Sequence, residues 1–555
     1  MEEYPWFKSY PKSVPHTVDV TTYSSVMEIV DEALSQFADK PAFTCMDKTI
    51  TYREVDKISR DFAAYLQSVG LKKGDRIALQ MPNVLQYPAI MFGAIRAGLV
   101  IVNTNPLYTN REMTHQFNDA EADAVVVLAN FASKIEEVLP KTKIKHVIVT
   151  EIGDLFGFFK GFITNFVVKN VKKMVPAYNL PEATTFKKAL SIGANAKYTK
   201  PDITPEDIAL LQYTGGTTGV SKGATLLNRN IIAHTLQVEQ WMKPKLELGK
   251  EIVITALPLY HIFALGVNCL LMLKVGAQSV LIPNPRDMPG FVEELTKYKF
   301  SVFTGVNTLF NGLLNTPGFD EVDFSSLKMC VGGGMAVQKA IADKWQKVTG
   351  SPLAEGYGLS ETSPVLSCNP IDGTEQIGTI GVPMPNTELK ILDDDGNEVA
   401  MGERGEICAK GPQVMKGYWN REEETRNTFF GDYFRTGDIG VMAEDGFFKI
   451  VDRKKDMILV SGFNVYPNEV EDVVASHEGV LEVAAIGVHD EKSTEAVKIF
   501  IVKKDPNLEA STIKAYCKEN LAGYKVPKHI EFREELPKSN VGKILRRMLK
   551  DEVAK

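Results

Sequence analysis

The sequence predicts an α/β protein of at least two domains. A chain of 555 residues is too long to fold around one compact core. Between residue 25 and about residue 385, short apolar runs alternate with amphipathic helical patterns, which is typical of α/β layers. The pattern then changes twice before the C-terminus. We therefore expect a large N-terminal domain of α/β layers with a small β unit, followed by a small α+β C-terminal domain.

The strands of the large domain are predicted from apolar runs of strand length. They are Asp75–Met81, Ala122–Ala129, Asp207–Gln212, Glu251–Tyr260 and Lys328–Met335. Helical patterns are expected at 228–242, with Asn228 as N-cap, and at 336–348. Several strands end in glycine-rich turns. Because α/β folds bind ligands at the carboxyl ends of their strands, we expect a site at those turns.

The rest of the chain supplies the other two units. Residues 389–450 contain an Asp-Gly turn between apolar runs, which predicts a small antiparallel β unit. After "VDRKKD" (Val451–Asp456), the pattern of strand, helix, hairpin and helix predicts the C-terminal domain. No internal repeat or low-complexity segment interrupts this organisation.

Composition excludes several classes of protein. A net charge of −7 argues against general nucleic-acid binding. The cysteines are scattered without metal-ligand spacing, and most lie in apolar runs, so we expect buried, reduced thiols. The N-terminus lacks the apolar core of a signal peptide, and no apolar run approaches the length of a membrane-spanning helix. We therefore expect a cytoplasmic protein.

The segment "YTGGTTGVSKGA" (Tyr213–Ala224) has the composition of a phosphate-binding loop. It is not a Walker A loop, because that pattern places the lysine directly after a glycine, whereas Lys222 follows Ser221. Its glycines allow the backbone to approach an anion closely, and successive N–H groups can bind one. A flexible linker is the alternative. The position between a predicted buried strand and a predicted helix favours the loop.

The segment Leu155–Met174, "LFGFFKGFITNFVVKNVKKM", predicts an amphipathic helix with an aromatic face. That face would carry the apolar residues Leu155, Phe159, Phe162, Ile163 and Phe166. Lysines lie away from the face or at its end, which is the pattern of a helix lying on anionic lipid. Packing on the protein's own body and contact with a second copy remain the alternatives.

Further motifs follow the glycine-rich loop along the chain. They are "LPLYHIFALG" (257–266), "EGYGLSET" (355–362), "YFRTGD" (433–438), "VDRKKDMILVSGFNVYPNEVE" (451–471) and "LPKSNVGKILRR" (536–547). In this order and spacing, the chain resembles the adenylate-forming superfamily over nearly its whole length. Several segments look most similar to bacterial long-chain fatty acid–CoA ligases. The resemblance implies that a carboxylate attacks ATP to give an acyl-adenylate and pyrophosphate, and that the coenzyme A thiol then displaces AMP.

The resemblance also implies which residues bind the nucleotide. The ATP- and AMP-binding residues would be Thr214, Gly215, Gly216, Thr217, Thr218, Gly219, Lys222, Gly333, Gly334, Glu355, Gly356, Tyr357, Ser360, Asp438, Arg453, Lys455 and Lys543. Thr214 of this set, together with Glu361, would hold Mg²⁺, which prefers a few protein oxygens together with phosphates. Asp438 would accept hydrogen bonds from the ribose hydroxyls, and Tyr357 would stack on the adenine.

The catalytic residues implied by the resemblance are Lys543, Glu361, Thr214 and Lys455. Lys543 would neutralise charge that develops during adenylation. Lys455 would be the pivot of a hinge at 452–456, between a large domain at 1–451 and a mobile C-terminal domain at 457–555. Two orientations of that small domain would serve the two half-reactions, one delivering Lys543 and the other the thiol path. As alternatives, Lys543 could be a solvated surface lysine, Glu361 a carboxylate at the start of a helix, and Asp438 a turn residue after Gly437.

Coenzyme A and the acyl group would bind at separate places. Ser461, Gly462 and Phe463 would line the path of the coenzyme A arm, and His261, Leu265 and Gly332 would border the acyl group. Leu265 stands where some relatives have a gating tryptophan, and Leu459 stands where some have lysine.

We expect a long-chain fatty acid as the substrate. The segment after "LPL" lacks the acid with which amino-acid-activating relatives hold an amine. A medium-chain or aromatic, coumarate-type carboxylate is the alternative substrate. A non-catalytic acyl-binding module is the alternative class, and the filled positions Lys543, Glu361 and Asp438 count against it.

Overall fold

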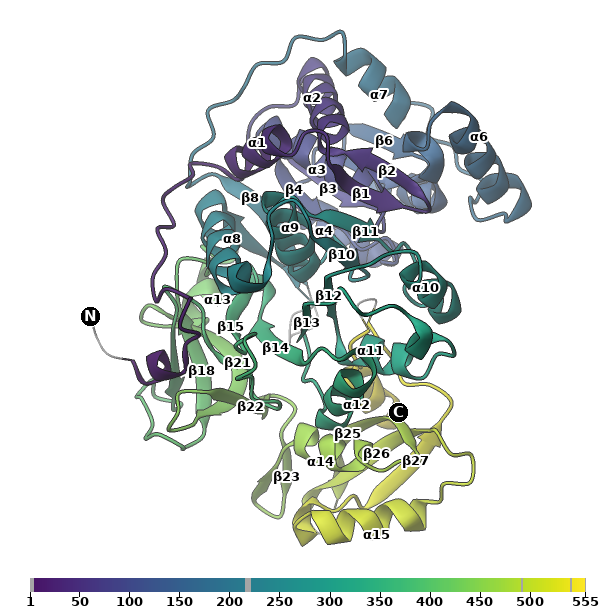
Figure 1. The fold of residues 1–555 in the computed structure, drawn as a ribbon. Helices are drawn as coiled ribbons and strands as arrows, with labels where there is room; N and C mark the ends of the chain where they lie inside the picture. Colours follow the sequence, from purple (N-terminus) through teal and green to yellow (C-terminus); the bar gives the residue numbers. More distant parts are fainter. Residues whose placement is uncertain (1–3, 215–220, 491–492, 540–541, 555) are drawn as a thin grey trace.

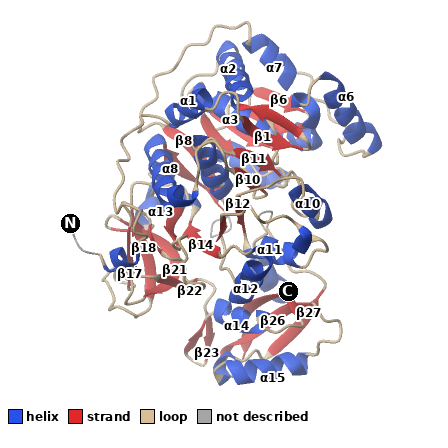
Figure 2. Ribbon diagram, in the orientation of Figure 1, coloured by secondary structure: helices blue, strands red, loops and turns tan. Residues whose placement is uncertain are grey.

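The computed structural model describes residues 4–214, 221–490, 493–539 and 542–554. Figures 1 and 2 show layered helices and strands in the N-terminal part, a β-rich unit beside them, and a smaller unit of strands and helices at the C-terminal end. This arrangement confirms the predicted fold class. No helix in the described ranges is both long enough and apolar enough to cross a bilayer.

The large N-terminal part is built on two mixed sheets. The first has the order β19 (Gly417–Tyr418), β9 (Lys222–Leu227), β8 (Ile208–Thr214), β4 (Val100–Asn103), β3 (Arg76–Gln80), β5 (Ala124–Leu128), β6 (His146–Thr150), β7 (Thr184–Thr185). The second has the order β16 (Val382–Pro383), β15 (Val365–Cys368), β14 (Leu353–Gly358), β13 (Met329–Gly333), β12 (Val302–Gly305), β10 (Ile252–Thr255), β11 (Gln278–Leu281), β1 (Pro41–Cys45), β2 (Lys48–Thr51). Most pairs in the middle of each sheet are parallel, as buried apolar strands require.

Two smaller sheets complete the fold. The third sheet contains β17 (Glu388–Leu392), β18 (Gly405–Lys410), β21 (Tyr433–Met442), β20 (Phe429–Phe430) and β22 (Phe448–Arg453), all paired antiparallel. The fourth contains β24 (Phe463–Val465), β23 (Ile458–Val460), β26 (Thr494–Lys503), β25 (Val480–Asp490) and β27 (His529–Arg533). The chain therefore passes from the third sheet to the fourth between Arg453 and Ile458.

Helices cover these sheets (Figure 1). In the large part they are α1 (Val26–Gln36), α2 (Tyr52–Ser68), α3 (Gln86–Arg96), α4 (Asn110–Asp119), α5 (Ala132–Val138), α6 (Phe158–Phe166), α7 (Phe186–Gly193), α8 (Asn228–Met242), α9 (Met272–Lys274), α10 (Met288–Leu295), α11 (Asn307–Leu314), α12 (Lys339–Thr349) and α13 (Glu422–Asn427). The C-terminal unit adds α14 (Pro467–Ala475), α15 (Ala510–Asn520) and α16 (Arg546–Val553).

The predicted strands and helices are present, and most of their ends shift by one to three residues. Two ends differ for a reason that the structure shows. The run predicted at Glu251–Tyr260 is a strand only as far as Thr255, because the Asn83 side chain donates to the carbonyls of Thr255 and Leu257 and turns the chain away. Asn228 is not the N-cap of α8 but its first helical residue. Its side chain instead accepts from the Val26 N–H at 2.9 Å, so a tertiary contact uses the capping group.

The cores explain why the C-terminal unit is separate. One large cluster of buried apolar side chains runs through the first, second and third sheets and the helices around them. The apolar side chains of the fourth sheet instead form clusters of their own, around Val470, Ile499 and Ile486. All the cysteines at the predicted positions are buried and free, as expected: Cys45, Cys269, Cys330, Cys368, Cys408 and Cys517.

The expected amphipathic helix is shorter than predicted, and Leu155 does not lie on its aromatic face. Regular α-helix covers only Phe158–Phe166 and continues as a π-helical turn over Val167–Val171. Leu155 lies in the preceding turn and packs against the core, so it is not on the aromatic face. That face is exposed to solvent, and Phe158 is 95% exposed, which excludes packing on the protein's own body.

Candidate active site

The predicted site residues meet where the second and third sheets face the C-terminal unit. A cavity of about 70 Å³ lies at the carboxyl ends of β13 and β14. Its lining contains His261, Gly333, Gly334, Gly356, Tyr357, Ser360 and Lys543 from the predicted set, together with apolar side chains of α8 and of the segment after β10. The carboxyl ends of parallel strands and a loop of the C-terminal unit thus line one cavity, and the α/β rule predicts a site at such strand ends.

Glycines let the strand ends pack tightly around this cavity. A Cβ on Gly333 would lie 3.1 Å from the Gly356 carbonyl oxygen and 3.1 Å from the Phe263 ring. A Cβ on Gly358 would lie 1.8 Å from the Pro364 carbonyl oxygen, so no larger residue fits there. Gly334 has a φ of +75°, and its Cα faces Lys543. At Gly333 and Gly358 the backbone of one segment approaches the backbone of another, which a larger residue would prevent.

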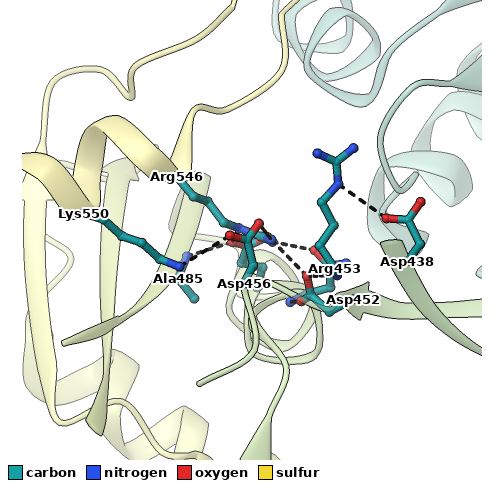
Figure 3. A network of polar contacts seen from close by, with 9 residues as sticks. Asp438, Asp452, Arg453, Asp456, Ala485, Arg546 and Lys550 are labelled. Atoms are coloured by element: carbon teal, nitrogen blue, oxygen red, sulfur yellow. Dashed lines mark hydrogen bonds and ion pairs between the residues drawn. The ribbon is translucent and has the colours of Figure 1, made fainter. Parts of the chain in front are cut away.

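Asp438 on β21 is the buried acid at the third-sheet side of the site. Tyr357 Oη donates a hydrogen bond to Asp438 Oδ2 at 2.6 Å, and Arg453 Nε lies 3.4 Å from Asp438 Oδ1 (Figure 3). Burial raises the pKa of Asp438, and the charge of Arg453 opposes that rise. Three predicted nucleotide-binding residues, distant in sequence, are thus in direct contact.

Glu361 is a second buried acid, in a short 3₁₀ turn after β14. Tyr418 Oη donates to its Oε1 at 2.8 Å, and burial raises the pKa of the carboxyl. Thr214, its predicted partner for Mg²⁺, is the last residue of β8. No group of three or more His, Cys, Asp or Glu side chains in the described part of the chain could hold a metal. The donors here are a carboxylate and a hydroxyl, so they fit an ion held mainly by phosphate oxygens.

Lys543 enters the site from the C-terminal unit. Its side chain lines the cavity and lies against Gly334. Burial lowers its pKa to about 8, the nearby charge of Arg453 acts in the same direction, and Asp438 and Glu361 act in the opposite one. His261 lies near the charge of Lys543. Burial first, and then that charge, lower the pKa of His261 to about 3, so this imidazole is neutral. Lys455 is affected as well, since burial and then Arg453 lower its pKa.

The glycine-rich loop is only partly described. Gly215, Gly216, Thr217, Thr218 and Gly219 lie outside the described residues. Lys222 begins β9 and forms an ion pair with Glu424, while its Nζ lies 5.4 Å from the centre of the Tyr418 ring. The ring therefore touches both Lys222 and the acid Glu361, and it links the loop to the cavity side of the site.

Other predicted residues lie away from the cavity. Within the described lining, neither Leu265 nor Gly332 is present. Leu265 is buried in a π-helical segment, and a Cβ on Gly332 would lie 2.7 Å from Val337, so both pack the core. Ser461 and Gly462 form the turn between β23 and β24, well separated from β13 and β14 in Figure 1. The structure thus brings Lys543, and not the predicted coenzyme A loop, to the cavity.

Sequence reasoning missed several residues of this site. Tyr418 and Glu424 carry no motif, although they contact the predicted Glu361 and Lys222. The apolar wall of α8, with Val238, Trp241 and Met242, was predicted only as an ordinary helix. An aromatic and aliphatic stripe at helical spacing gives no signal of its own, because buried helices in general share it.

Comparison with known proteins places the chain. The AMP-binding enzyme family matches residues 30–419, and the C-terminal domain of AMP-binding enzymes matches residues 469–543. The chain belongs to the AMP-binding enzyme family. Both matched stretches contribute to the cavity, the first with the strand ends and the second with Lys543.

Individual members of the family are similar over nearly the whole chain. A protein of Salmonella typhimurium strain LT2 named long-chain-fatty-acid–CoA ligase is 56% identical, over 99% of this chain and 98% of the relative. A protein of Haemophilus influenzae with the same name is 53% identical over the same shares. Among solved structures, an anthranilate CoA ligase in complex with anthranoyl-AMP matches with a TM-score of 0.85, 26% identity, and 97% and 99% coverage.

Proposed function

We propose that the protein activates a long-chain fatty acid with ATP and then joins it to coenzyme A. The products would be an acyl-CoA thioester, AMP and pyrophosphate. The observation that carries this function is Lys543 lining the cavity within reach of the charges of the buried acids Asp438 and Glu361, in a chain that belongs to the AMP-binding enzyme family. The names of the relatives support a long-chain substrate.

The site chemistry fits the first half-reaction. A carboxylate that attacks the α-phosphate meets strong repulsion from the triphosphate, and charge then develops on that phosphate and on pyrophosphate. Lys543 would neutralise this charge from within a site that excludes water, where electrostatic effects are large. Asp438 would accept hydrogen bonds from the ribose hydroxyls in addition to the one that it accepts from the Tyr357 hydroxyl. Glu361 and Thr214 would hold Mg²⁺, which supplies further charge neutralisation to the phosphates when bound.

The second half-reaction requires the C-terminal unit to turn. We place the hinge at 452–456, with domains at 1–451 and 457–555 and with Lys455 as the pivot. Support comes from the chain passing between sheets after Arg453 and from the separate apolar clusters of the fourth sheet. In a second orientation, Lys543 would leave the cavity, and Ser461, Gly462 and Phe463 would approach it.

The acyl group would enter between α8 and the segment after β10. Trp241, Met242, Phe263 and Val267 line this side of the cavity. The cavity of about 70 Å³ is smaller than the roughly 300–1,000 Å³ of typical ligand pockets, so a long chain requires these side chains to move apart. A shorter or aromatic acid needs less movement, and it is the alternative substrate class.

The substrate class is tested by measuring AMP release with ATP, Mg²⁺ and coenzyme A across acetate, octanoate, palmitate, oleate and coumarate. We expect the highest kcat/KM with palmitate or oleate. A maximum at octanoate, coumarate or acetate would contradict the long-chain assignment but retain the reaction. Absence of AMP release with every acid would contradict the reaction itself.

We further propose that α6 holds the enzyme at the inner face of the membrane. The small and polar side of the helix faces the body: Gly161 approaches Gly153 closely, and Asn165 Oδ1 accepts from the Gly153 N–H at 2.7 Å. The aromatic side is left to solvent, with Phe162 67% exposed. Such an exposed apolar patch marks an interaction surface.

Charge favours anionic lipid as the partner. Lys169, Lys172 and Lys173 are exposed just after the aromatic face. Aromatic side chains beside lysines suit the boundary between headgroups and acyl chains of an anionic bilayer. Such docking would also place the enzyme where its apolar substrate concentrates.

This surface is tested with a triple serine variant of Phe158, Phe159 and Phe162. We expect loss of co-sedimentation with phosphatidylglycerol vesicles and an unchanged Tm, because the removed rings are exposed. Leu248→Ser, on an exposed residue elsewhere, is the matched control and should bind like the wild type. Unchanged sedimentation of the triple variant would overturn the lipid assignment. A dimer that only the wild type forms would instead assign the face to a second copy.

A further inference from the structure

Helix α11 of the large domain contacts the C-terminal unit at two points. Thr308 Oγ1 donates to the Gly542 carbonyl at 2.8 Å, and Asn311 Nδ2 donates to the Leu481 carbonyl at 2.8 Å. Residues three apart share one face of a helix, so a single face of α11 makes both contacts. One contact is to the loop that carries Lys543, and the other is to the start of strand β25.

The large domain holds α11 firmly. The Gln338 N–H donates to Asn307 Oδ1 at 3.0 Å, which joins the start of α11 to the residue before α12. On the opposite face of α11, Phe310 packs edge-on against the Trp345 ring, with 4.7 Å between ring centroids. Both rings are fully buried. The face that carries Thr308 and Asn311 is therefore a fixed surface.

Among the described residues of the Lys543 loop, Ser539, Gly542 and Lys543 are joined by backbone hydrogen bonds. The Ser539 N–H donates to the Lys543 carbonyl at 2.7 Å, and the Gly542 N–H donates to the Ser539 carbonyl at 3.0 Å. Gly542 has a φ of +84°, and a Cβ there would lie 2.7 Å from Thr308 Oγ1. Holding the Gly542 carbonyl therefore holds the adjacent Lys543 toward the cavity.

We propose that Thr308 and Asn311 are positioning residues that select the orientation in which Lys543 enters the cavity. This rests on the two orientations of the proposed function. A bond that exists in one orientation only shifts the equilibrium between the two by its own free energy. In the other orientation, water replaces the Gly542 and Leu481 carbonyls as acceptors.

The charge of Lys543 explains why the inward orientation needs these two contacts of α11. Moving an ammonium group from water into a buried site is unfavourable, and before the triphosphate binds, the charges of Asp438 and Glu361 offset part of that cost. Neutral contacts outside the cavity stabilise the inward orientation without touching the substrate. They also do not bind the lysine itself, so its charge remains available for the reaction.

Measuring the two half-reactions separately distinguishes a positioning role of Thr308 and Asn311 from a role in folding, because a folding defect would lower both. Thr308→Val keeps the shape of the side chain and removes the donor, and Asn311→Ala removes the second donor. Each should lower ATP–pyrophosphate exchange, by at most about 2- to 10-fold, the effect of one neutral hydrogen bond on the equilibrium, and the double variant should lower it further. Thioester formation from supplied acyl-adenylate should not fall. Thr316→Val, whose hydroxyl donates only within its own chain segment to Gly312, is the matched control.

A second measurement reports orientation without catalysis. The described cysteines are buried, so introduced surface cysteines at Asp320 and Lys514 can carry a fluorescent donor and acceptor pair. In the double variant, the distribution of distances between the dyes should shift toward the second orientation relative to the wild type. The positioning role of Thr308 and Asn311 would be contradicted by any of three results in the double variant: equal loss of both half-reactions, unchanged exchange, or an unchanged distance distribution. If the wild type shows no exchange but the double variant still shifts the distance distribution, the proposed reaction is wrong and the positioning role of Thr308 and Asn311 stands.

Discussion

Lys543 lies in an environment that few lysines occupy, since lysines are mostly exposed. Its motif marked it by resemblance, but the burial of its side chain and its contact with Gly334 belong to the folded chain. The same holds for Asp438: its pairing with Tyr357 could not be predicted, because 80 residues and two sheets separate them. At this scale, sequence identifies the groups, and structure supplies their pKa values.

The lowered pKa of Lys543 predicts a basic limb in the rate of adenylation. The lysine must be protonated to neutralise phosphate charge, and its pKa in the free enzyme is about 8. The kcat/KM for ATP should therefore fall as pH rises through that value. The limb in kcat should lie at higher pH, because bound triphosphate raises the lysine pKa. Steady-state pyrophosphate release across pH measures both.

Lys543→Arg provides the control for this limb. Arginine stays protonated throughout, so the variant should be slower but should lack the basic limb. If the arginine variant retains the limb with the same midpoint, another group titrates and the assignment to Lys543 is wrong.

Helix α16 is joined to the hinge segment by a buried ionic network (Figure 3). Arg546 donates to both Glu471 oxygens, at 2.9 and 2.6 Å, and to Asp452 Oδ1 at 3.2 Å. Asp456 lies 3.6 Å from the same guanidinium, and it also accepts from Lys550 at 3.4 Å. The sequence shows the neighbouring Arg546 and Arg547 but not which of them turns inward, since that depends on how α16 packs on β25 and α14.

Arg546→Met should destabilise the C-terminal unit strongly. Removal of the cation leaves Glu471 and Asp452 as buried acids without their main partner, which typically costs about 3–5 kcal/mol. Chemical denaturation, followed by a probe in this unit, measures the change. Arg547→Met is the matched control, because the adjacent arginine is exposed and faces only Asp551 at 3.8 Å. Equal destabilisation by the two variants would contradict the role of the network.

At the scale of the whole molecule, the described orientation brings one functional loop to the cavity and leaves the other away from it. Lys543 lines the cavity, while the turn at Ser461 and Gly462 is well separated from β13 and β14 (Figure 1). The apolar clusters of the C-terminal unit do not merge with the main core. A body with its own core can change orientation without unfolding.

Lys543→Ala should therefore separate the half-reactions. Adenylation should fall about 100- to 1000-fold, the usual cost of removing an electrostatic donor to a transition state. Thioester formation from supplied acyl-adenylate should continue at the wild-type rate. Lys514→Ala, on an exposed face of α15, should alter neither step. Loss of both steps to the same extent in Lys543→Ala would contradict the two-orientation scheme.

The sequence by itself determined the fold class, the order of the units, the family and most of the chemical groups of the site. These depend on local periodicity and on motifs a few residues long, which a single chain displays directly. The tertiary structure decided which groups meet: Tyr357 with Asp438, Tyr418 with Glu361, and α11 with the Lys543 loop. It also decided that the aromatic side of α6 faces solvent. Contacts across long sequence distances depend on the packing of whole layers, which no local pattern encodes.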